Sequence, residues 1–316
     1  MPYIATNAVK SSTMSNKRLL YIAGPTGVGK TALSISMAKE LQTEIISCDA
    51  RQCYREMTIG TAVPNEEDRA SIPHHFIQSK SIHQSFDAWR FEKEGLNLLE
   101  QLFKKHDYVI MVGGSGLYAK ALMDGMDKFP EIEPDSVSKV KLLYQKNGLD
   151  SLQKLLKEKD PDYYKMVDLK NPRRLIRALE VFEATKKPYS SFLGQSNRQR
   201  TFGSQILLLQ LPRNKLYNDI NQRVELMVKD GLEREAQRLY SYKNLPALQT
   251  VGYREWFNHF EGKYSREETI SEIQKNTRRY AKRQITWFNQ LNTHVIPMDV
   301  PVKAIKIALD CIESIS

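Results

Sequence analysis

Residues 24–31 read Gly-Pro-Thr-Gly-Val-Gly-Lys-Thr, which matches the pattern GxxxxGK followed by Ser or Thr. The apolar run Leu19–Ala23 precedes this stretch, and Leu33, Met37 and Leu41 follow it at helical spacing. A strand, a glycine-rich turn and a helix are therefore predicted in that order. This context is typical of a phosphate-binding loop (P-loop), where backbone N–H groups and a helix N-terminus hold phosphate oxygens. The predicted phosphate-binding residues are Gly24, Pro25, Thr26, Gly27, Val28, Gly29, Lys30 and Thr31, of which Lys30 would neutralise phosphate charge and Thr31 can bind Mg²⁺ through its hydroxyl.

Further strands are predicted at Glu44–Cys48, Tyr108–Val112 and Gln205–Leu211. Strands that alternate with helices favour a parallel sheet covered on both faces, with ligands at the carboxyl ends of the strands. The predicted fold class is α/β, a P-loop NTPase-like parallel sheet core with a helical insertion domain. The core takes residues 18–125 and 205–316, mostly helical towards the C-terminus, and the insertion takes 126–204. Residues 1–17 are predicted to form a flexible N-terminal extension.

The composition favours a soluble protein with a polyanionic partner. Lys and Arg total 47 against 37 Asp and Glu, a net charge of +10, in a chain too aromatic to be a disordered polycation. Nucleic acid is favoured over membrane, although a merely basic cytosolic protein stays open. The three cysteines form no CxxC pair, which indicates a reducing compartment, and we expect a cytoplasmic location. No apolar run reaches membrane-spanning length, so no membrane partner is expected.

Asp49 ends the second predicted strand and should share an edge of the sheet with the P-loop, which makes it the best candidate for a general base. Two alternatives stay open, because an Asp here could cap the following turn or hold a water bound to Mg²⁺. Ser115, in the glycine-rich segment after Tyr108–Val112, can donate or accept a hydrogen bond, although a purely structural turn is an equal reading. The adjacent His74 and His75 are predicted to be loop residues rather than metal ligands.

Two basic faces are candidates for binding RNA. Asn171 is predicted to cap a helix with Pro172 in its first turn and with Leu175, Leu179 and Phe182 as its buried stripe. On another face of that helix lie Arg173 and Arg177. Near the C-terminus, basic side chains are interleaved with Tyr280, Trp287 and Phe288, as suits phosphate contact and base stacking, although a solvated helix face is an equal reading. The basic residues of this second cluster are Lys275, Arg278, Arg279, Lys282 and Arg283.

From Leu19 to Phe288 the chain resembles the tRNA dimethylallyltransferase (isopentenyltransferase) family, in its bacterial form without a C-terminal zinc finger. The P-loop is similar to the family's, and so are several later segments. They are 49–64 (family DSxQxYRxMxIGTAKP), 72–75 (IPHH), 112–118 (VGGTGLY), 174–180 (RLxRALE), 252–255 (GYRE) and 277–288 (TRxxAKRQxTWF). The chain differs from the family pattern at Ala50, Arg51, Val63 and Asn289, and Ser115 replaces Thr but keeps the hydroxyl.

The resemblance implies transfer of a dimethylallyl group from dimethylallyl diphosphate to tRNA. The acceptor would be the exocyclic N6 amine of the adenosine on the 3′ side of the anticodon, in tRNAs that read U-initial codons. It assigns the base to Asp49, a hydroxyl beside the reacting centre to Ser115 and a diphosphate-binding guanidinium to Arg223. It also implies tRNA contacts on the anticodon stem-loop from Asp49, Ala50, Arg51 and Gln52 and from Arg173, Arg174, Leu175, Ile176 and Arg177.

We also expect Mg²⁺ as the cofactor and a monomeric enzyme. Two other activities stay open. One is transfer of the same group to free AMP or ATP, against which the helical insertion and the basic C-terminal helix argue. The other is a P-loop kinase acting on a small molecule.

Overall fold

The computed structural model describes residues 16–130, 132–194 and 199–313. In these residues a six-stranded sheet has the order β3-β2-β4-β1-β5-β6, and every pair of neighbouring strands is parallel. The strands are β1 (Arg18–Ala23), β2 (Ile45–Ser47), β3 (His74–His75), β4 (Tyr108–Gly113), β5 (Gly203–Gln210) and β6 (His294–Pro297). β1 is central, and its Leu20 is in register with Ile110 on β4 and Gln205 on β5. The first 15 residues, which contain most of the predicted extension, lie outside the described residues.

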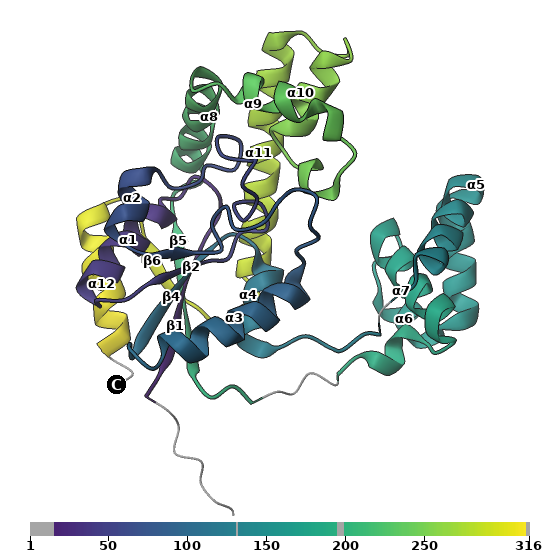
Figure 1. The fold of residues 1–316 in the computed structure, drawn as a ribbon, viewed down its shortest axis with the longest axis horizontal. Coiled ribbons are helices and arrows are strands. Elements are labelled where there is room, and N and C mark those ends of the chain that lie inside the picture. Colours follow the sequence, from purple (N-terminus) through teal and green to yellow (C-terminus); the bar gives the residue numbers. More distant parts are fainter. Residues whose placement is uncertain (1–15, 131, 195–198, 314–316) are drawn as a thin grey trace, which may run out of the picture. The chain divides into compact units, whose positions relative to one another are not determined.

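Helices cover the sheet, with α1 and α12 close together on one side of it and α3 and α4 on another side (Figure 1). The helices of this core are α1 (Lys30–Glu40), α2 (Glu66–Ser71), α3 (Ala88–Leu102), α4 (Gly116–Asp124), α8 (Arg213–Lys229), α9 (Leu232–Leu239), α10 (Tyr253–Phe260), α11 (Arg266–Phe288) and α12 (Pro301–Glu313). α8, α9, α10 and α11 pack against one another beyond the carboxyl ends of the strands. This placement brings residues 213–288 to the edge of the sheet where the P-loop lies.

The hydrophobic core follows the alternation of side chains along β1. Leu20 and Ile22 are fully buried in a cluster that includes Met37 of α1 and Ala308 of α12. Tyr21 points to the opposite face, where its ring meets the ring of Phe288 edge-on and its hydroxyl donates to the Gly113 carbonyl. Because both faces of β1 are buried, the strand reads as a continuous apolar run.

The described residues divide into two compact units, and the second spans 124–199, where the sequence analysis placed 126–204. The difference at the C-terminal boundary has a clear cause, because β5 begins at Gly203 and Arg200 is anchored in the first unit. The Arg200 guanidinium donates to Glu92 Oε1 at 2.9 Å and to the Ala121 carbonyl at 2.8 Å.

The second unit is helical, as predicted. It contains α5 (Pro134–Lys159), α6 (Pro161–Met166) and α7 (Pro172–Thr185), and Gly148 interrupts α5 with a φ of 69°. Asn171 is the N-cap of α7 but makes no side-chain capping hydrogen bond. Leu175 and Leu179 are buried in the core of the unit, whereas Phe182 is only partly buried.

One expectation about strands was wrong. His74 and His75 form the short edge strand β3 rather than a loop, and His75 Nε2 lies 2.7 Å from Glu44 Oε2. The C-terminal part is mostly helical, as predicted, and it also contains the unpredicted strand β6, of which only Ile296 is buried. Four residues with one buried position give too short an alternation to be recognised in a sequence. None of the helices that the structure describes is long and apolar enough to cross a membrane.

Candidate active site

The P-loop connects the end of β1 to the first turn of α1 through three glycines with positive φ. Gly29 is the N-cap of α1 with a φ of 93°, and Gly27 has a φ of 84°. Gly24 has a φ of 152°, and a Cβ added there would lie 2.9 Å from Val28 Cγ1. Glycine adopts positive φ values readily because it has no Cβ, whereas other residues rarely do. The loop therefore wraps around the N-terminus of α1, whose dipole and N–H groups favour an anion.

A cavity of about 310 Å³ lies at this loop. Its lining combines the P-loop with residues at or just after the ends of β2 and β4, among them Asp49, Gln52, Gly113 and Gly114. A second cavity of about 130 Å³ has a more apolar wall that includes Ile220, Val224, Met227, Leu232 and Ile273. Five residues line both cavities, and these are Thr26, Asp49, Thr61, Arg223 and Tyr280. The cavity at the P-loop and the more apolar cavity thus adjoin at Asp49 and Arg223.

Lys30 is folded back onto its own loop. Its Nζ donates to the Gly24 carbonyl at 2.9 Å and to the Pro25 carbonyl at 2.8 Å. The pKa of Lys30 is lowered to about 7, chiefly by burial and then by the positive charge of Arg223, while the Asp49 carboxylate opposes the shift. An anion placed in the cavity would stabilise the ammonium form and raise this pKa again.

Asp49 caps the turn that follows β2. Its Oδ1 accepts hydrogen bonds from the backbone N–H of Arg51 at 2.8 Å and of Gln52 at 3.3 Å. Among the described residues, every hydrogen bond found for this carboxylate goes to Oδ1. The capping alternative is therefore correct, but it uses one oxygen only and leaves the base prediction standing. Oδ2 provides the second oxygen of a carboxylate that lines both cavities.

Ser115 joins the segment after β4 to the segment after β2. Its Oγ accepts from the Ala50 N–H at 3.0 Å, and its own N–H donates to the Cys48 carbonyl at 3.3 Å. The neighbouring Gly113 permits this contact, because a Cβ there would lie 2.1 Å from the Cys48 oxygen. The structural reading of this glycine-rich turn is thereby confirmed, and the Ser115 hydroxyl is held one residue away from Asp49.

Arg223 comes from α8, more than a hundred residues away in sequence from the other two predicted catalytic residues. Burial lowers its pKa, and the nearby Asp49 carboxylate raises it. Tyr280 of α11 lines the same junction, and burial followed by the Asp49 charge raises the pKa of its phenol to about 12. A guanidinium and a neutral phenol are thus both available to an anion at this point.

Glu235 on α9, which was not among the predicted site residues, holds the segment 58–60, and Gly60 of this segment lines the second cavity. Its carboxylate accepts from the backbone N–H groups of Thr58, Ile59 and Gly60 at 2.9–3.0 Å, and from the Tyr253 hydroxyl at 2.7 Å. The side chain is 2% exposed. Four donors compensate for the burial of this charge. A single Glu on a helix carries no spacing signal that could have revealed this role.

The oxygen donors at the P-loop fit a magnesium ion. Thr31 lies in the first turn of α1 and lines the larger cavity together with Ser47 and Asp49. Mg²⁺ prefers hard oxygen ligands and usually takes the remainder from water and substrate phosphates. Within the described part of the chain, no group of three or more His, Cys, Asp and Glu side chains could hold a metal.

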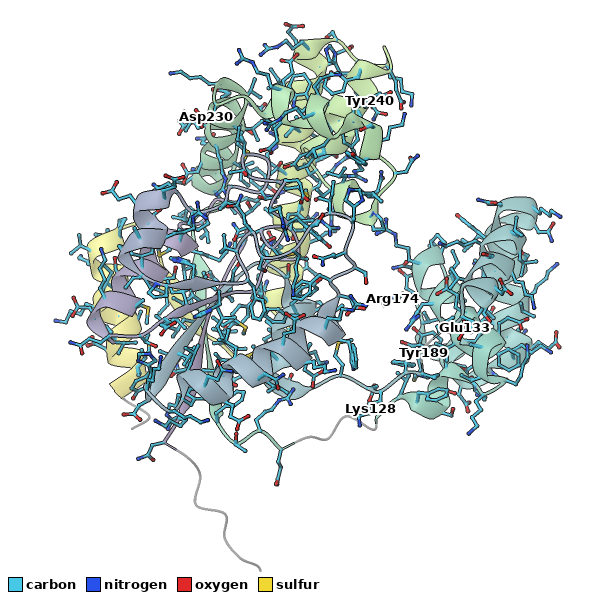
Figure 2. The ribbon with its side chains drawn as sticks, in the orientation of Figure 1. Lys128, Glu133, Arg174, Tyr189, Asp230 and Tyr240 are labelled. Carbon is cyan, nitrogen blue, oxygen red and sulfur yellow. The ribbon has the colours of Figure 1, made fainter. Side chains whose placement is uncertain are left out.

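The predicted tRNA-binding residues differ in their accessibility. Arg173, Arg174 and Arg177 are exposed on α7, whereas Ile176 is partly buried and Leu175 is fully buried. Leu175 packs in the core of its unit, so the prediction that its side chain contacts tRNA is corrected. Figure 2 shows Arg174 and Tyr189 among the side chains of this unit.

The other predicted tRNA-binding residues belong to the first unit. Arg279, Lys282 and Arg283 are exposed on α11, but Arg278 is partly buried and donates to Asn221 Oδ1 on α8. The remaining candidates, Ala50, Arg51 and Gln52, follow Asp49, and Gln52 Nε2 donates to the Thr61 and Ala62 carbonyls.

Comparison with known proteins matches this architecture to one family. A model of IPP transferases matches residues 52–291. The chain belongs to the IPP transferase family. The tRNA dimethylallyltransferase of Christiangramia forsetii is 50% identical over 277 residues, which cover 88% of this chain and 91% of the relative. That of Flavobacterium johnsoniae is 48% identical over 280 residues, which cover 87% and 91%.

Solved structures agree with this family assignment. The full-length tRNA isopentenylpyrophosphate transferase of Bacillus halodurans aligns with a TM-score of 0.69 at 32% identity, covering 94% of this chain and 97% of that one. A eukaryotic dimethylallyltransferase acting on tRNA aligns with a TM-score of 0.79 at 25% identity, covering 94% and 80%. The likeness to IPP transferases therefore extends over both units of the chain.

Proposed function

We propose that this protein transfers a dimethylallyl group from dimethylallyl diphosphate to a tRNA. The acceptor is the exocyclic N6 amine of the adenosine on the 3′ side of the anticodon in tRNAs that read U-initial codons. The bond between C1 of the donor and the diphosphate oxygen breaks, a bond between C1 and N6 forms, and the amine loses a proton. The products are isopentenyladenosine in tRNA, diphosphate and a proton. The observation that carries the proposal is the junction of the P-loop cavity with a more apolar cavity at Asp49 and Arg223.

The P-loop side of this junction suits the leaving group. Diphosphate carries several negative charges that must be stabilised as the C1–O bond breaks. Lys30 and Arg223 supply positive charge, and the N-terminus of α1 supplies N–H donors. When diphosphate enters, Lys30 exchanges the Gly24 and Pro25 carbonyls for phosphate oxygens. Thr31 would hold Mg²⁺, which supplies further charge neutralisation when it is bound.

The Asp49 side of the junction suits the acceptor. The amine of adenosine is a weak nucleophile, so it needs to be oriented and to lose its proton as the new bond forms. The backbone N–H groups of Arg51 and Gln52 fix the orientation of the carboxylate through Oδ1, and Oδ2 takes the proton. Ser115 lies beside it and positions the amine with its hydroxyl.

The charge of the protein suits an RNA substrate. Arg173, Arg174 and Arg177 are exposed on α7, and Arg279, Lys282 and Arg283 are exposed on α11. These residues would contact phosphates of the anticodon stem-loop, and Arg51 with its neighbours would contact the base. We place the enzyme in the cytoplasm as a monomer. Transfer to free AMP is disfavoured because a mononucleotide needs neither basic face.

An assay that compares possible acceptors and donors tests this proposal. Radiolabelled dimethylallyl diphosphate is offered with unmodified tRNA, with AMP, or with neither. We expect label in tRNA and free diphosphate in proportion to it, and no phosphate release from ATP alone. Label in AMP but not in tRNA would assign the adenylate reaction instead. Phosphoryl transfer from ATP without use of the prenyl donor would assign the kinase activity.

A further inference from the structure

Gln284 of α11 contacts the P-loop, and its side chain forms hydrogen bonds with two loops that are far apart in sequence. Its side chain is 6% exposed and lines the P-loop cavity. The side-chain Oε1 accepts a hydrogen bond from the Thr26 N–H at 2.9 Å. The side-chain Nε2 donates to the Gly114 carbonyl at 3.0 Å. One carboxamide thus links the P-loop to the segment that carries Ser115.

The two partners determine how the carboxamide is oriented. A backbone N–H can only donate and a carbonyl can only accept, so Oε1 must face Thr26 and Nε2 must face Gly114. Met or an ionised Glu at this position has about the right length but cannot provide both a donor and an acceptor. Space is also limited, because a Cβ added at Gly114 would lie 2.1 Å from Gln284 Nε2.

The Pro25–Thr26 peptide is held at both of its polar atoms. Its carbonyl oxygen accepts from Lys30 Nζ at 2.8 Å, and its N–H donates to Gln284 Oε1. The hydrogen bond from Lys30 is lost when the ammonium turns to an anion in the cavity. The hydrogen bond to Gln284 is then the one of the two that remains, so it continues to hold this peptide during turnover.

We propose that Gln284 is a positioning residue that holds the P-loop and the Ser115 segment in fixed positions relative to each other. It holds the Thr26 peptide so that the other N–H groups of the loop point at the diphosphate. It also fixes the distance between the diphosphate site and the Asp49 and Ser115 pair. This inference rests on the proposed function for its role in turnover, but the binding of diphosphate is measurable without any transfer.

The test uses inorganic diphosphate with Mg²⁺ as the probe, measured by calorimetry on the full chain. Gln284→Met and Gln284→Glu are expected to weaken diphosphate binding roughly tenfold, as follows from loss of one or two buried hydrogen bonds. The affinity for tRNA is expected to stay close to wild type, and the Tm should fall modestly because these buried hydrogen bonds also stabilise the fold. Gln290→Met, which changes an exposed glutamine just beyond α11, is the matched control and should bind diphosphate normally.

A second variant reaches the same contact from the other side. Gly114→Ala places a methyl group where the Gln284 amide lies, and it is expected to weaken diphosphate binding to a similar extent. The double variant Gln284→Met with Gly114→Ala should have a diphosphate affinity only slightly below that of either single variant, since both changes remove the same contact between Gln284 and Gly114. This variant also decides the matter if Gln284→Met does not fold.

Three results would overturn the inference. The first is diphosphate affinity within twofold of wild type in folded Gln284 variants. The second is full additivity in the double variant. The third is a fall in tRNA affinity as large as the fall in diphosphate affinity, which would mark a general structural role rather than positioning of the P-loop. If wild-type protein transferred no label to tRNA yet the diphosphate results were as expected, the proposed function would fail and the positioning role would stand.

Discussion

Lys30 gives a quantitative prediction about proton uptake. In the structure its pKa is lowered to about 7, first by burial and then by Arg223. A lowered lysine pKa means that the neutral amine predominates above pH 7, whereas bound diphosphate favours the ammonium form and raises the pKa. Binding should therefore take up a proton wherever the free enzyme is deprotonated. With a pKa of about 7, roughly nine-tenths of Lys30 side chains are neutral at about pH 8 and roughly one-tenth at about pH 6.

Calorimetry in two buffers of different ionisation enthalpy measures this uptake directly. At about pH 8 we expect the wild type to take up nearly one proton more per diphosphate bound than Lys30→Arg, a difference that removes any proton change of diphosphate itself, and an apparent affinity roughly tenfold below the limit for charged Lys30. The control is Lys30→Arg, whose guanidinium stays charged and should show no such uptake. Absence of proton uptake in the wild type, or equal uptake in Lys30→Arg, would refute the reasoning.

Three further predictions concern the base, the RNA-binding face and the segment beside the site. Asp49→Asn keeps the turn but removes the charge, so the single-turnover rate should fall by roughly 10²–10⁴-fold. Recovery near wild type at high Mg²⁺ would instead make Asp49 an indirect metal ligand. Replacing Arg173 and Arg177 by Ala should lower the log–log salt slope of tRNA binding by roughly 1 per lost phosphate contact, and an unchanged slope would remove α7 from the RNA interface. Glu235→Gln should lower the free energy of unfolding by about 2–3 kcal/mol in urea denaturation, whereas no change would mean that its four hydrogen bonds contribute little to stability.

The sequence predicts the P-loop well because its structure is determined locally. Fixed glycine spacing supplies the positive φ values, and an apolar run before it and a helical pattern after it define β1 and α1. Asp49 was found for a similar reason, since the end of a buried parallel strand indicates the edge of the sheet. Neither prediction needs information from distant parts of the chain.

Residues from the C-terminal helices could not be found from periodicity. Arg223, Glu235 and Gln284 reach the site because α8, α9 and α11 fold back over it, and only tertiary packing determines that arrangement. Arg223 was found through the resemblance to a family, which carries such information. For Gln284 the signal was its place within a family motif, but nothing in its spacing indicated that it contacts Thr26.

In the two basic stretches, charge in the sequence does not by itself identify which side chains are exposed. Arg278 belongs to the same run as Arg279 and Lys282, yet it turns towards Asn221 on α8. Leu175 lies between two exposed arginines, but its apolar side chain is buried with the other core residues of α7. Helical periodicity had already placed Leu175 in the buried stripe, so in this case the local physical argument was better than the motif as a whole.

Product analysis on an anticodon stem-loop tests the central claim most directly. The wild-type protein is incubated with dimethylallyl diphosphate, Mg²⁺ and an unmodified stem-loop of a tRNA that reads U-initial codons, and the RNA is digested and examined by mass spectrometry. We predict one dimethylallyl group on the exocyclic amine of the adenosine that follows the anticodon, and none when guanosine replaces that adenosine. An unmodified stem-loop from wild-type protein that binds both substrates, or modification at another nucleotide, would contradict the account.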